Sequence, residues 1–495
     1  MHLALPPQTA PNDTSFPRNR DAVRTWLDDL NPAENVDDAA ELLRGLRHSN
    51  RLTNDAEARR SVLEEFRPSL KPLIDSLSQS ISPQPLPMAA SFRHASALLD
   101  ELLREETNAR KILLAHSENP SLEDATEALD ALYRLAKAAV QQYRKVPRHC
   151  LRDANHIYAL AEREGLFSTK KSSRDTRDEL IDSLQNSYAG ILTLATLNLK
   201  QIRAKQLDLT LAFLSDHFDK VRLSTDAPTG VWRNTQCIVD LHSSDVPSVA
   251  SSYLGDLSKP TVRWIDFSAL METIETRLSK TRTTFSVTLG ADTLERQTLS
   301  RLNFQFTSSR ERKLARRVSY DLANLSFGHQ QISNQLLRDV DASKYLDDDV
   351  YFVEWTRINH SDNGAAFSSV TPEIGSVQVG ELVAAIEEGS STLGVVRWVH
   401  AREDGTIEFG MEYLSNEIVP VELIRDNAEE GVTDEALIIA CRVNGKVTQT
   451  ILLPGYRFHT GDRLTAQQLA RKKQIKLGQC LQSNGMFSQF ILSEG

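Results

Sequence analysis

The sequence predicts a multidomain α+β protein with an all-α N-terminal helical array, a small α+β connector, an antiparallel β-barrel and a β-rich C-terminal subdomain. Its 495 residues are enough for several domains. Helical periodicity dominates to about residue 205, and strand and turn signals dominate from residue 301. We expect five segments: a disordered arm (1–18), a helical interaction module (19–205), an α+β connecting region (206–300), a barrel with a preceding arginine-rich segment (301–416) and a β-rich subdomain (417–495).

Apolar residues recur with helical spacing in the N-terminal half. Between residues 21 and 30 they follow the i, i+3, i+4, i+7 pattern of an amphipathic helix. Ser121 is expected to cap a long helix, because Asp124 follows three residues later. Pro68 and Pro72 are expected to interrupt their segment. Short connections favour an antiparallel bundle, and an array of helical repeats is the alternative, although no fixed period is visible.

The C-terminal part is rich in hairpin signals. Asn444-Gly445 separates two apolar, β-branched runs, and Ser483-Asn484-Gly485 separates two more. These four strands indicate a compact β subdomain. In the connecting region, residues 236–241 and 262–267 are strand-like, and residues 270–278 are expected to form an amphipathic helix.

Composition and charge limit the classes of function. The net charge of -10 argues against the whole surface being a nucleic-acid platform and leaves a local basic patch as the alternative, and we expect no DNA partner. There is no run of about 18 apolar residues and no signal peptide at the N-terminus, which favours a cytoplasmic protein without a membrane span. The cysteines lie far apart, and the histidines form no metal or nucleophile motif. We therefore expect no metal, no cofactor, no catalytic residues and no enzyme activity.

An arginine-rich segment reverses the sign of the charge locally. Residues 301–317 contain six basic residues and one acidic residue. Arg312 and Arg316 within it have the spacing RxxxR. An arginine fork can pair with a phosphate in a bidentate way while its plane stacks on a base, so this segment suits an anionic ligand with aromatic bases. A solvated helix or linker face is the alternative.

A polar turn follows about forty residues later. Residues 353–358 alternate as a half-buried strand does, so Asn359 and Ser361 should lie on one face at its end. Gly364 lets the backbone turn there without a Cβ clash. The result is two hydrogen-bonding side chains at the rim of a sheet, or else only an Asx-type turn. Trp355 and Trp398 are expected to lie in the barrel core.

RxxxR followed by a strand that ends in (D/N)xSxxG resembles the signature of PilZ domains, six-stranded bacterial β-barrels that bind cyclic di-GMP. The later runs Val379–Val383, Gly394–Val399 and Phe409–Leu414 are similar to the family's next strands. The resemblance covers roughly residues 305–416. Forty-two residues separate Arg316 from Asn359, which is more than in the family, and we expect this insertion to hold a strand and a short helix.

The resemblance implies a ligand and a site. Cyclic di-GMP would contact Arg312, Arg316 and Arg317 through guanine faces and phosphates, Asn359 and Ser361 would bind a guanine edge or a phosphate, and Gly364 would shape the turn. Guanine acceptors suit arginine, and guanine N–H donors suit an amide oxygen.

We therefore expect a bacterial signalling protein in which cyclic di-GMP switches a protein–protein interaction in motility, pili or surface polymer. An unidentified protein partner would bind the helical N-terminal module. The alternative is a degenerate PilZ-like scaffold that binds protein partners without nucleotide.

Overall fold

A computed structural model of the chain describes residues 3–8, 16–33, 35–81, 83–167, 176–228, 234–283, 291–307, 315–340, 353–369, 376–387, 390–425, 433–455, 457–468 and 471–494. The chain forms two compact units. The first contains residues 1–84 and 89–310, and the second contains residues 85–88 and 311–495. Helices dominate the first unit and two antiparallel barrels the second, so the predicted multidomain α+β class is confirmed.

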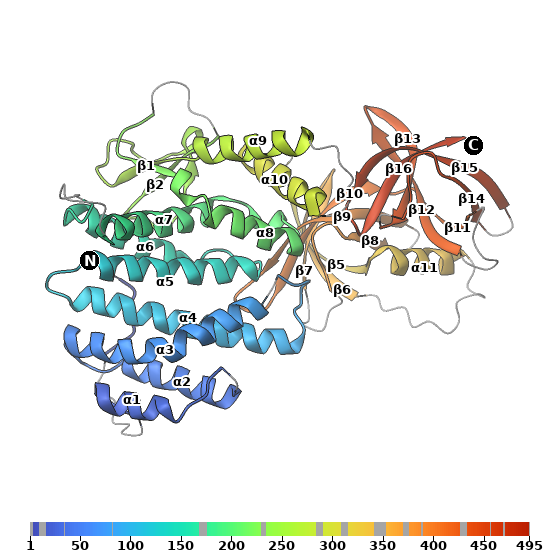
Figure 1. Cartoon of the computed structure of the whole chain (residues 1–495). Coiled ribbons are helices and arrows are strands. Elements are labelled where there is room, and N and C mark those ends of the chain that lie inside the picture. Colours follow the sequence, from blue (N-terminus) through green and yellow to red (C-terminus); the bar gives the residue numbers. More distant parts are fainter. Residues whose placement is uncertain are drawn as a thin grey trace. The chain divides into compact units, whose positions relative to one another are not determined.

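The first unit is mostly helical, and its helices can be followed in Figure 1. Ser121 caps α5 with the predicted capping box, in which its side chain accepts from the Asp124 amide. The helices are α1 (Arg20–Asp28), α2 (Val36–Ser49), α3 (Ala56–Ser80), α4 (Ala90–His116), α5 (Leu122–Gln141), α6 (Arg148–Arg163), α7 (Thr176–Thr196), α8 (Ala204–Ser215), α9 (Ser268–Thr283) and α10 (Ala291–Thr307).

Helix α3 runs without a break through Pro68 and Pro72, so the predicted interruption is wrong. Each proline removes one backbone hydrogen bond and crowds the preceding turn. Phe66, Leu70 and Leu73 on the same helix are buried in the core that α3 shares with α1, α2 and α4. Burial of this apolar face outweighs the local cost of the prolines.

A small antiparallel sheet belongs to the same unit. Its strand order is β1-β4-β2-β3, and Ile238, Val262 and Trp264 form its core. The predicted strands of the connecting region are confirmed here. The strands are β1 (Arg222–Ser224), β2 (Gln236–Asp240), β3 (Ser248–Val249) and β4 (Val262–Asp266).

Residues 3–8 fall in the segment for which disorder was expected, yet they are held by a buried ion pair. The Lys111 ammonium lies 2.9 Å from the Asp153 carboxylate, and both side chains are buried. Ala4 donates its amide to Asp153 (3.1 Å) and accepts from Lys111 (2.5 Å). Because each charge has a partner and hydrogen bonds, the pair can stay buried and hold the chain at Ala4.

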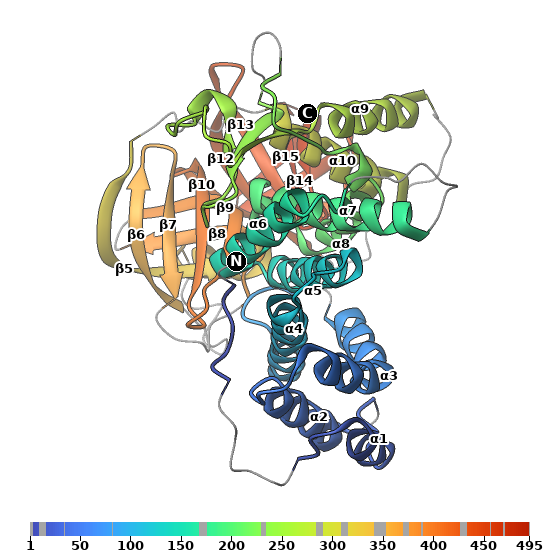
Figure 2. The same ribbon diagram turned by 90° about the vertical axis from the view of Figure 1, so that its left-hand side faces the viewer.

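The second unit begins with a closed six-stranded antiparallel barrel of order β10-β7-β6-β5-β8-β9. Figure 2 shows β5, β6 and β7 side by side. Aromatic rings fill its interior: Trp355 lies 4.8 Å from Phe409, and Phe367 lies 5.2 Å from it, between ring centroids. The strands are β5 (Arg317–Phe327), β6 (Val353–Ser361), β7 (Gly364–Ser369), β8 (Leu382–Glu387), β9 (Ser390–Ala401) and β10 (Ile407–Ser415).

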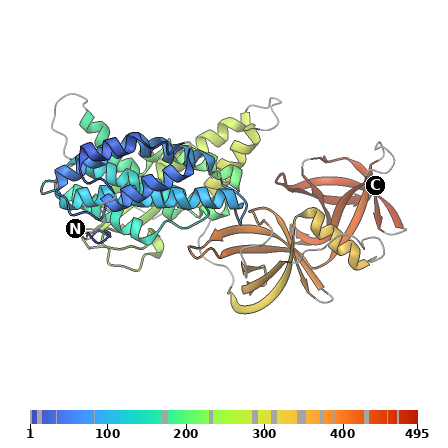
Figure 3. The ribbon, with the colours of Figure 1, turned by 90° about the horizontal axis from the view of Figure 1, so that it is seen from below.

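The C-terminal part is a second closed antiparallel barrel, of order β11-β12-β13-β16-β15-β14 (Figure 3). Asn444 and Gly445 form the predicted tight turn, both with positive φ. The four strands expected from hairpin signals are present, and β11 and β14 complete the barrel. The strands are β11 (Ile418–Arg425), β12 (Thr433–Val443), β13 (Lys446–Pro454), β14 (Arg463–Gln468), β15 (Arg471–Ser483) and β16 (Phe487–Glu494).

Helix α11 (His329–Val340) joins the two barrels through a shared core. Ile332 and Leu336 of α11 pack with Leu393 of the first barrel and Leu452 of the second. The imidazole Nε2 of His329 lies 3.1 Å from the Leu452 carbonyl oxygen. The two barrels are therefore packed together, with α11 forming part of the contact.

Candidate functional site

The strand register brings the arginines next to the polar turn. β5 begins at Arg317, which lies opposite His360 of β6, and the next residue, Val318, lies opposite Asn359. The insertion, which contains α11, connects the C-terminal end of β5 to the N-terminal end of β6. The ends of the two strands that carry Arg317 and Asn359 are the opposite ones. In an antiparallel pair such an insertion does not separate the near ends. The 42 residues between Arg316 and Asn359 therefore leave the start of β5 at Arg317 beside the end of β6.

The predicted site residues differ in their surroundings. Arg316 and Arg317 are exposed, whereas Asn359 and Ser361 are half-buried. The Ser361 hydroxyl donates to the Gly364 carbonyl oxygen at 3.3 Å. Arg312 lies outside the described residues.

Gly364 is required for a different reason from the one expected. Gly364 is the first residue of β7 and lies opposite Glu412 of β10. A Cβ at this position would collide with the Met411 carbonyl oxygen. The glycine therefore permits close approach of two strands, which is a tertiary requirement and not one of the turn itself.

Asn359 belongs to a row of residues on the outer face of the barrel. The register runs from Val318 through Asn359, Ala366 and Gly410 to Trp398. Phe367 and Phe409, the neighbours of Ala366 and Gly410, stack inside the barrel, and side chains alternate between the two faces. The row therefore faces outward.

Trp355 and Trp398 have different positions. Trp355 is fully buried among the core aromatic rings, as predicted. Trp398 is half-buried, and a Cβ at Gly410 would collide with its indole ring. The ring thus lies across Gly410 on the outer face, so the prediction that Trp398 belongs to the core is wrong. The absence of a side chain at Gly410, on another strand, decides this placement.

The outer face of β5 carries an apolar stripe that the sequence interpretation missed. Val318, Tyr320 and Leu322 are exposed at 70%, 77% and 61%. β8 pairs only with residues 324–327 of β5, so residues 317–323 have one strand partner in the described part of the barrel. The alternation Val-x-Tyr-x-Leu directly after Arg317 was the signal for this longer strand.

His360 adds a polar group beside Arg317. The two residues lie opposite each other in the register, and the Nδ1 atom of His360 is buried without a hydrogen-bond partner among the described residues. On the same strand pair, Asp321 accepts a hydrogen bond from the Ser319 hydroxyl. The barrel mouth therefore combines exposed guanidinium groups with a buried imidazole nitrogen.

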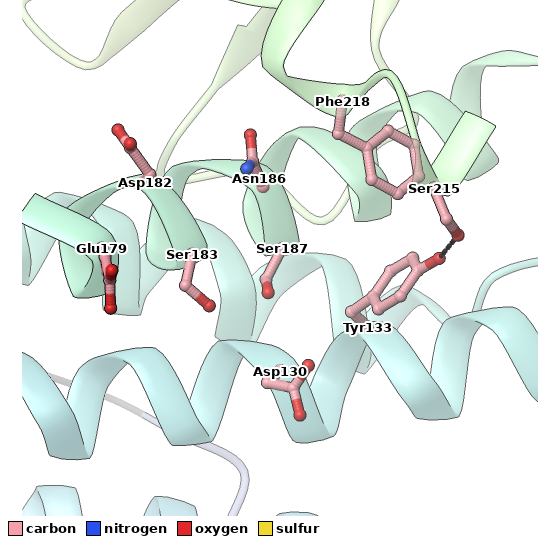
Figure 4. A pocket seen from close by; sticks show the side chains of 9 residues that line it. All are labelled: Asp130, Tyr133, Glu179, Asp182, Ser183, Asn186, Ser187, Ser215 and Phe218. Carbon is pink, nitrogen blue, oxygen red and sulfur yellow. Dashed lines mark hydrogen bonds between the residues drawn. The ribbon is translucent and has the colours of Figure 1, made fainter. Parts of the chain in front are cut away.

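A pocket in the helical unit is lined by acidic side chains, in contrast to the arginines of the first barrel (Figure 4). It has a volume of about 430 Å³, and Asp130, Glu179 and Asp182 contribute three carboxylates to its lining. Arg134 neutralises Asp130 at 3.2 Å. The pocket also contains Tyr133, whose hydroxyl lies 2.7 Å from the Ser215 hydroxyl, and burial raises the pKa of this tyrosine. A ligand with two phosphates would be repelled here.

The described residues were also considered for a metal site and for a membrane-spanning helix. No group of three or more His, Cys, Asp or Glu side chains there is arranged to hold a metal ion. None of the described helices is both long and apolar enough to span a membrane.

The comparison with family models found one match. Residues 21–229 match the model for the cyclic-di-GMP receptor FimW, N-terminal domain, and this range runs from α1 to β1. The match covers less than half of the chain and, apart from residues 85–88, lies within the first compact unit. No curated protein and no solved structure gave a match.

Proposed function

We propose that this protein is a non-enzymatic cytoplasmic receptor for cyclic di-GMP and that the nucleotide binds the outer face of the first barrel, which is PilZ-like. One observation carries the proposal: β5 and β6 pair so that Arg317 lies opposite His360 and Val318 opposite Asn359. The match of residues 21–229 to the N-terminal domain of a cyclic-di-GMP receptor supports the identity of the ligand.

The chemistry of the barrel rim suits this dianionic ligand. Arg316 and Arg317 are exposed and can pair with phosphates or with guanine O6 and N7. Asn359 offers an amide oxygen to the guanine N–H groups. The acidic pocket of the helical unit is the poorer choice because of its three carboxylates. The matched N-terminal part would then serve a protein partner, while the barrel holds the nucleotide.

Tyr320, which is exposed, and Trp398, which is half-buried, provide apolar surface for a base. Tyr320 lies two residues after Val318 on β5, and Trp398 closes the same outer row on β9. Stacking of a base on an aromatic ring stabilises binding by about 1–3 kcal/mol. The ligand would therefore lie along the barrel between β5 and β9, with its phosphates near the arginines.

The proposed consequence of binding is a switch in a protein–protein interaction that serves motility, pili or surface polymer. A ligand shifts such an equilibrium only if it binds one state more tightly than the other. Arg316 directly precedes β5, so a nucleotide held by Arg316 and Asn359 would fix Arg316 against the barrel in the bound state.

Calorimetric titration of the full chain with cyclic di-GMP tests the site. The double variant Arg316→Ala/Arg317→Ala and the single variant Asn359→Ala should each weaken binding at least tenfold, since each removes charge-assisted or amide hydrogen bonds worth about 1.5–3 kcal/mol. Arg442→Ala, an exposed arginine on the second barrel, is the matched control. Unaltered affinity in the double variant, with the control also unaltered, would reject this site.

The second candidate function is a scaffold that binds proteins without nucleotide. The apolar stripe of Val318, Tyr320 and Leu322 favours it, because an exposed stripe with a free strand edge can accept an extended partner segment. A partner captured equally well by wild type, by Arg316→Ala/Arg317→Ala and without cyclic di-GMP would support the scaffold and contradict the receptor.

A further inference from the structure

The second barrel contains a cationic face that neither the family match nor the proposed nucleotide site explains. Residues 463–483 contain five basic residues and no acidic residue, in a protein of net charge -10. These residues form β14 and β15, which pair from Arg463 opposite Lys476 to Gln468 opposite Arg471. All five basic side chains are exposed: Arg463, Arg471, Lys472, Lys473 and Lys476.

The register arranges three of these cations on the outer face. Leu464, Ile475 and Leu477 are buried in the barrel core, so the alternate positions face outward. The outward row consists of Arg463, Thr465 and Gln467 on β14 and of Lys472, Gln474 and Lys476 on β15. Glu422 of β11 lies opposite Gln467 and borders this face.

Two positive charges lie directly opposite each other in this face. Arg463 and Lys476 are cross-strand neighbours, an arrangement that destabilises a sheet unless an anion lies between the charges. Between the outward positions of the two strands, the Gln474 side-chain amide donates to the Thr465 hydroxyl at 2.8 Å. Among the described residues, no salt bridge of 4 Å or less involves any of the five cations.

The same pair of strands in the first barrel has a different role. Both barrels have the cyclic order 1-2-3-6-5-4 when their strands are numbered along the chain, so β8 and β9 correspond to β14 and β15. The outer face of β8 and β9 is apolar and is buried against α11 and the second barrel through Leu382, Ala384, Leu393 and Val395. The equivalent face of the second barrel is exposed and cationic.

We propose that the β14–β15 face of the second barrel binds the phosphate backbone of duplex nucleic acid. Lysine, arginine, threonine and glutamine are the side chains that contact phosphate oxygens in such complexes. The proposal reverses the expectation of no DNA partner, which rested on the net charge of the whole chain. A local face of one sign determines this kind of binding, and the overall charge does not.

The composition of the face favours a duplex over other polyanions. Residues 463–483 contain no aromatic residue, so bases of a single strand would find no stacking platform. The outward row has no large apolar side chain, which a helix or strand needs to enter a lipid surface. Regularly spaced cations with amide and hydroxyl groups between them suit contact with a regular backbone without reading its sequence.

Fluorescence anisotropy with the full chain and a labelled duplex of about two helical turns tests the proposal. Three phosphate contacts, from Arg463, Lys472 and Lys476, would make log K fall with log salt concentration with a slope of about -2.7. The variant Lys472→Gln/Lys476→Gln should reduce that slope by about 1.8 and weaken binding at low salt at least about tenfold. Lys71→Gln/Lys145→Gln, two exposed lysines of the helical unit, is the matched control and should bind as wild type does.

Two further measurements decide between this surface and its alternatives. Arg316→Ala/Arg317→Ala should bind the duplex as wild type does, so a failure at the nucleotide site would leave this result unchanged. Absence of duplex binding at low salt would overturn the proposal. So would binding to vesicles containing phosphatidylglycerol, or to a single strand of the same sequence, that is tighter than duplex binding and lost in the Lys472/Lys476 variant.

Discussion

The two barrels share one strand topology and differ in what their surfaces carry. Both close in the cyclic order 1-2-3-6-5-4. In the first, strand 1 begins with Arg317 and strand 2 ends with Asn359 and Ser361. In the second, strand 1 begins with Ile418, and strand 2 ends with Cys441 and Val443 before the Asn444-Gly445 turn. The residues of the proposed nucleotide site are therefore present in only one of the two barrels, because fold and site are specified by different residues.

The cores of the two barrels also differ in the side chains that fill them. The first is filled by aromatic rings around Phe409, whereas the second is mostly aliphatic, with Leu423, Ile451 and Leu477 fully buried. In both barrels the described core side chains pack against one another inside, and we place the proposed ligand on the outer face.

The largest expected effect is on the aromatic core. Phe409→Ala should destabilise the second unit by about 3–5 kcal/mol, because it removes contacts with Phe327, Trp355 and Phe367 and leaves a cavity. Ile451→Val, which removes one methyl group from the core of the second barrel, should cost only about 1 kcal/mol. Chemical denaturation measures both, and equal losses would contradict the stated difference between the cores.

The next largest effect on stability is expected at the apolar contact that α11 makes with both barrels. Ile332→Ala in α11 should cost about 2–4 kcal/mol, since this side chain is fully buried against both barrels. It should also split a single unfolding transition into two, because the barrels lose their coupling. Differential scanning calorimetry distinguishes the cases. A single transition that only shifts would mean that the barrels stay coupled without α11.

One half-buried carboxyl in each barrel makes stability depend on pH. Burial raises the pKa of Glu381 to about 7, and burial together with the neighbouring Glu422 raises that of Glu435 to about 7. The folded state holds these protons more tightly than the unfolded state, so stability should fall as pH rises from about 4.5 to 7 and then level off.

The variant Glu381→Gln tests this dependence. It should stabilise the protein at pH 8 by about 2 kcal/mol and leave stability at pH 5 nearly unchanged, because the penalty of ionising a half-buried carboxyl is absent. Urea unfolding between pH 4.5 and pH 8 measures this. If the unfolding free energy of Glu381→Gln changes with pH as steeply as that of the wild type, other groups cause the pH dependence.

The smallest effects compare two glycines at the connection between the second and third strands of each barrel, Gly364 at the start of β7 and Gly445 in the turn before β13. Gly364→Ala places a Cβ against the Met411 carbonyl oxygen and should cost about 2 kcal/mol and weaken nucleotide binding. Gly445→Ala has no neighbour within 4 Å but requires φ of +82°, so it should cost about 1 kcal/mol. Thermal denaturation with nucleotide titration separates them, and a loss of nucleotide binding in Gly445→Ala would contradict the assignment.

Local signals in the sequence were sufficient for much of the fold. The Ser121 cap, the Asn444-Gly445 hairpin and the alternation of residues 353–358 each depend on a few neighbouring residues, and each prediction is confirmed. Pro68 and Pro72 were misjudged because their cost is local while the compensating burial of Phe66 and Leu73 comes from other helices. Trp398 was misjudged because alternation alone does not tell which face of a strand is the core.

The sequence by itself determined which chemistry this protein can offer: arginines before one strand, an amide and a hydroxyl at the end of the next, and a cationic run near the C-terminus. Only the tertiary structure decided which of these groups meet. Pairing of β5 with β6 places Arg317 opposite His360 although a long insertion lies between them in the chain, and pairing of β14 with β15 places Arg463 opposite Lys476. Strand register depends on burial of one face over the whole barrel, so it cannot be derived from the few residues that form a site.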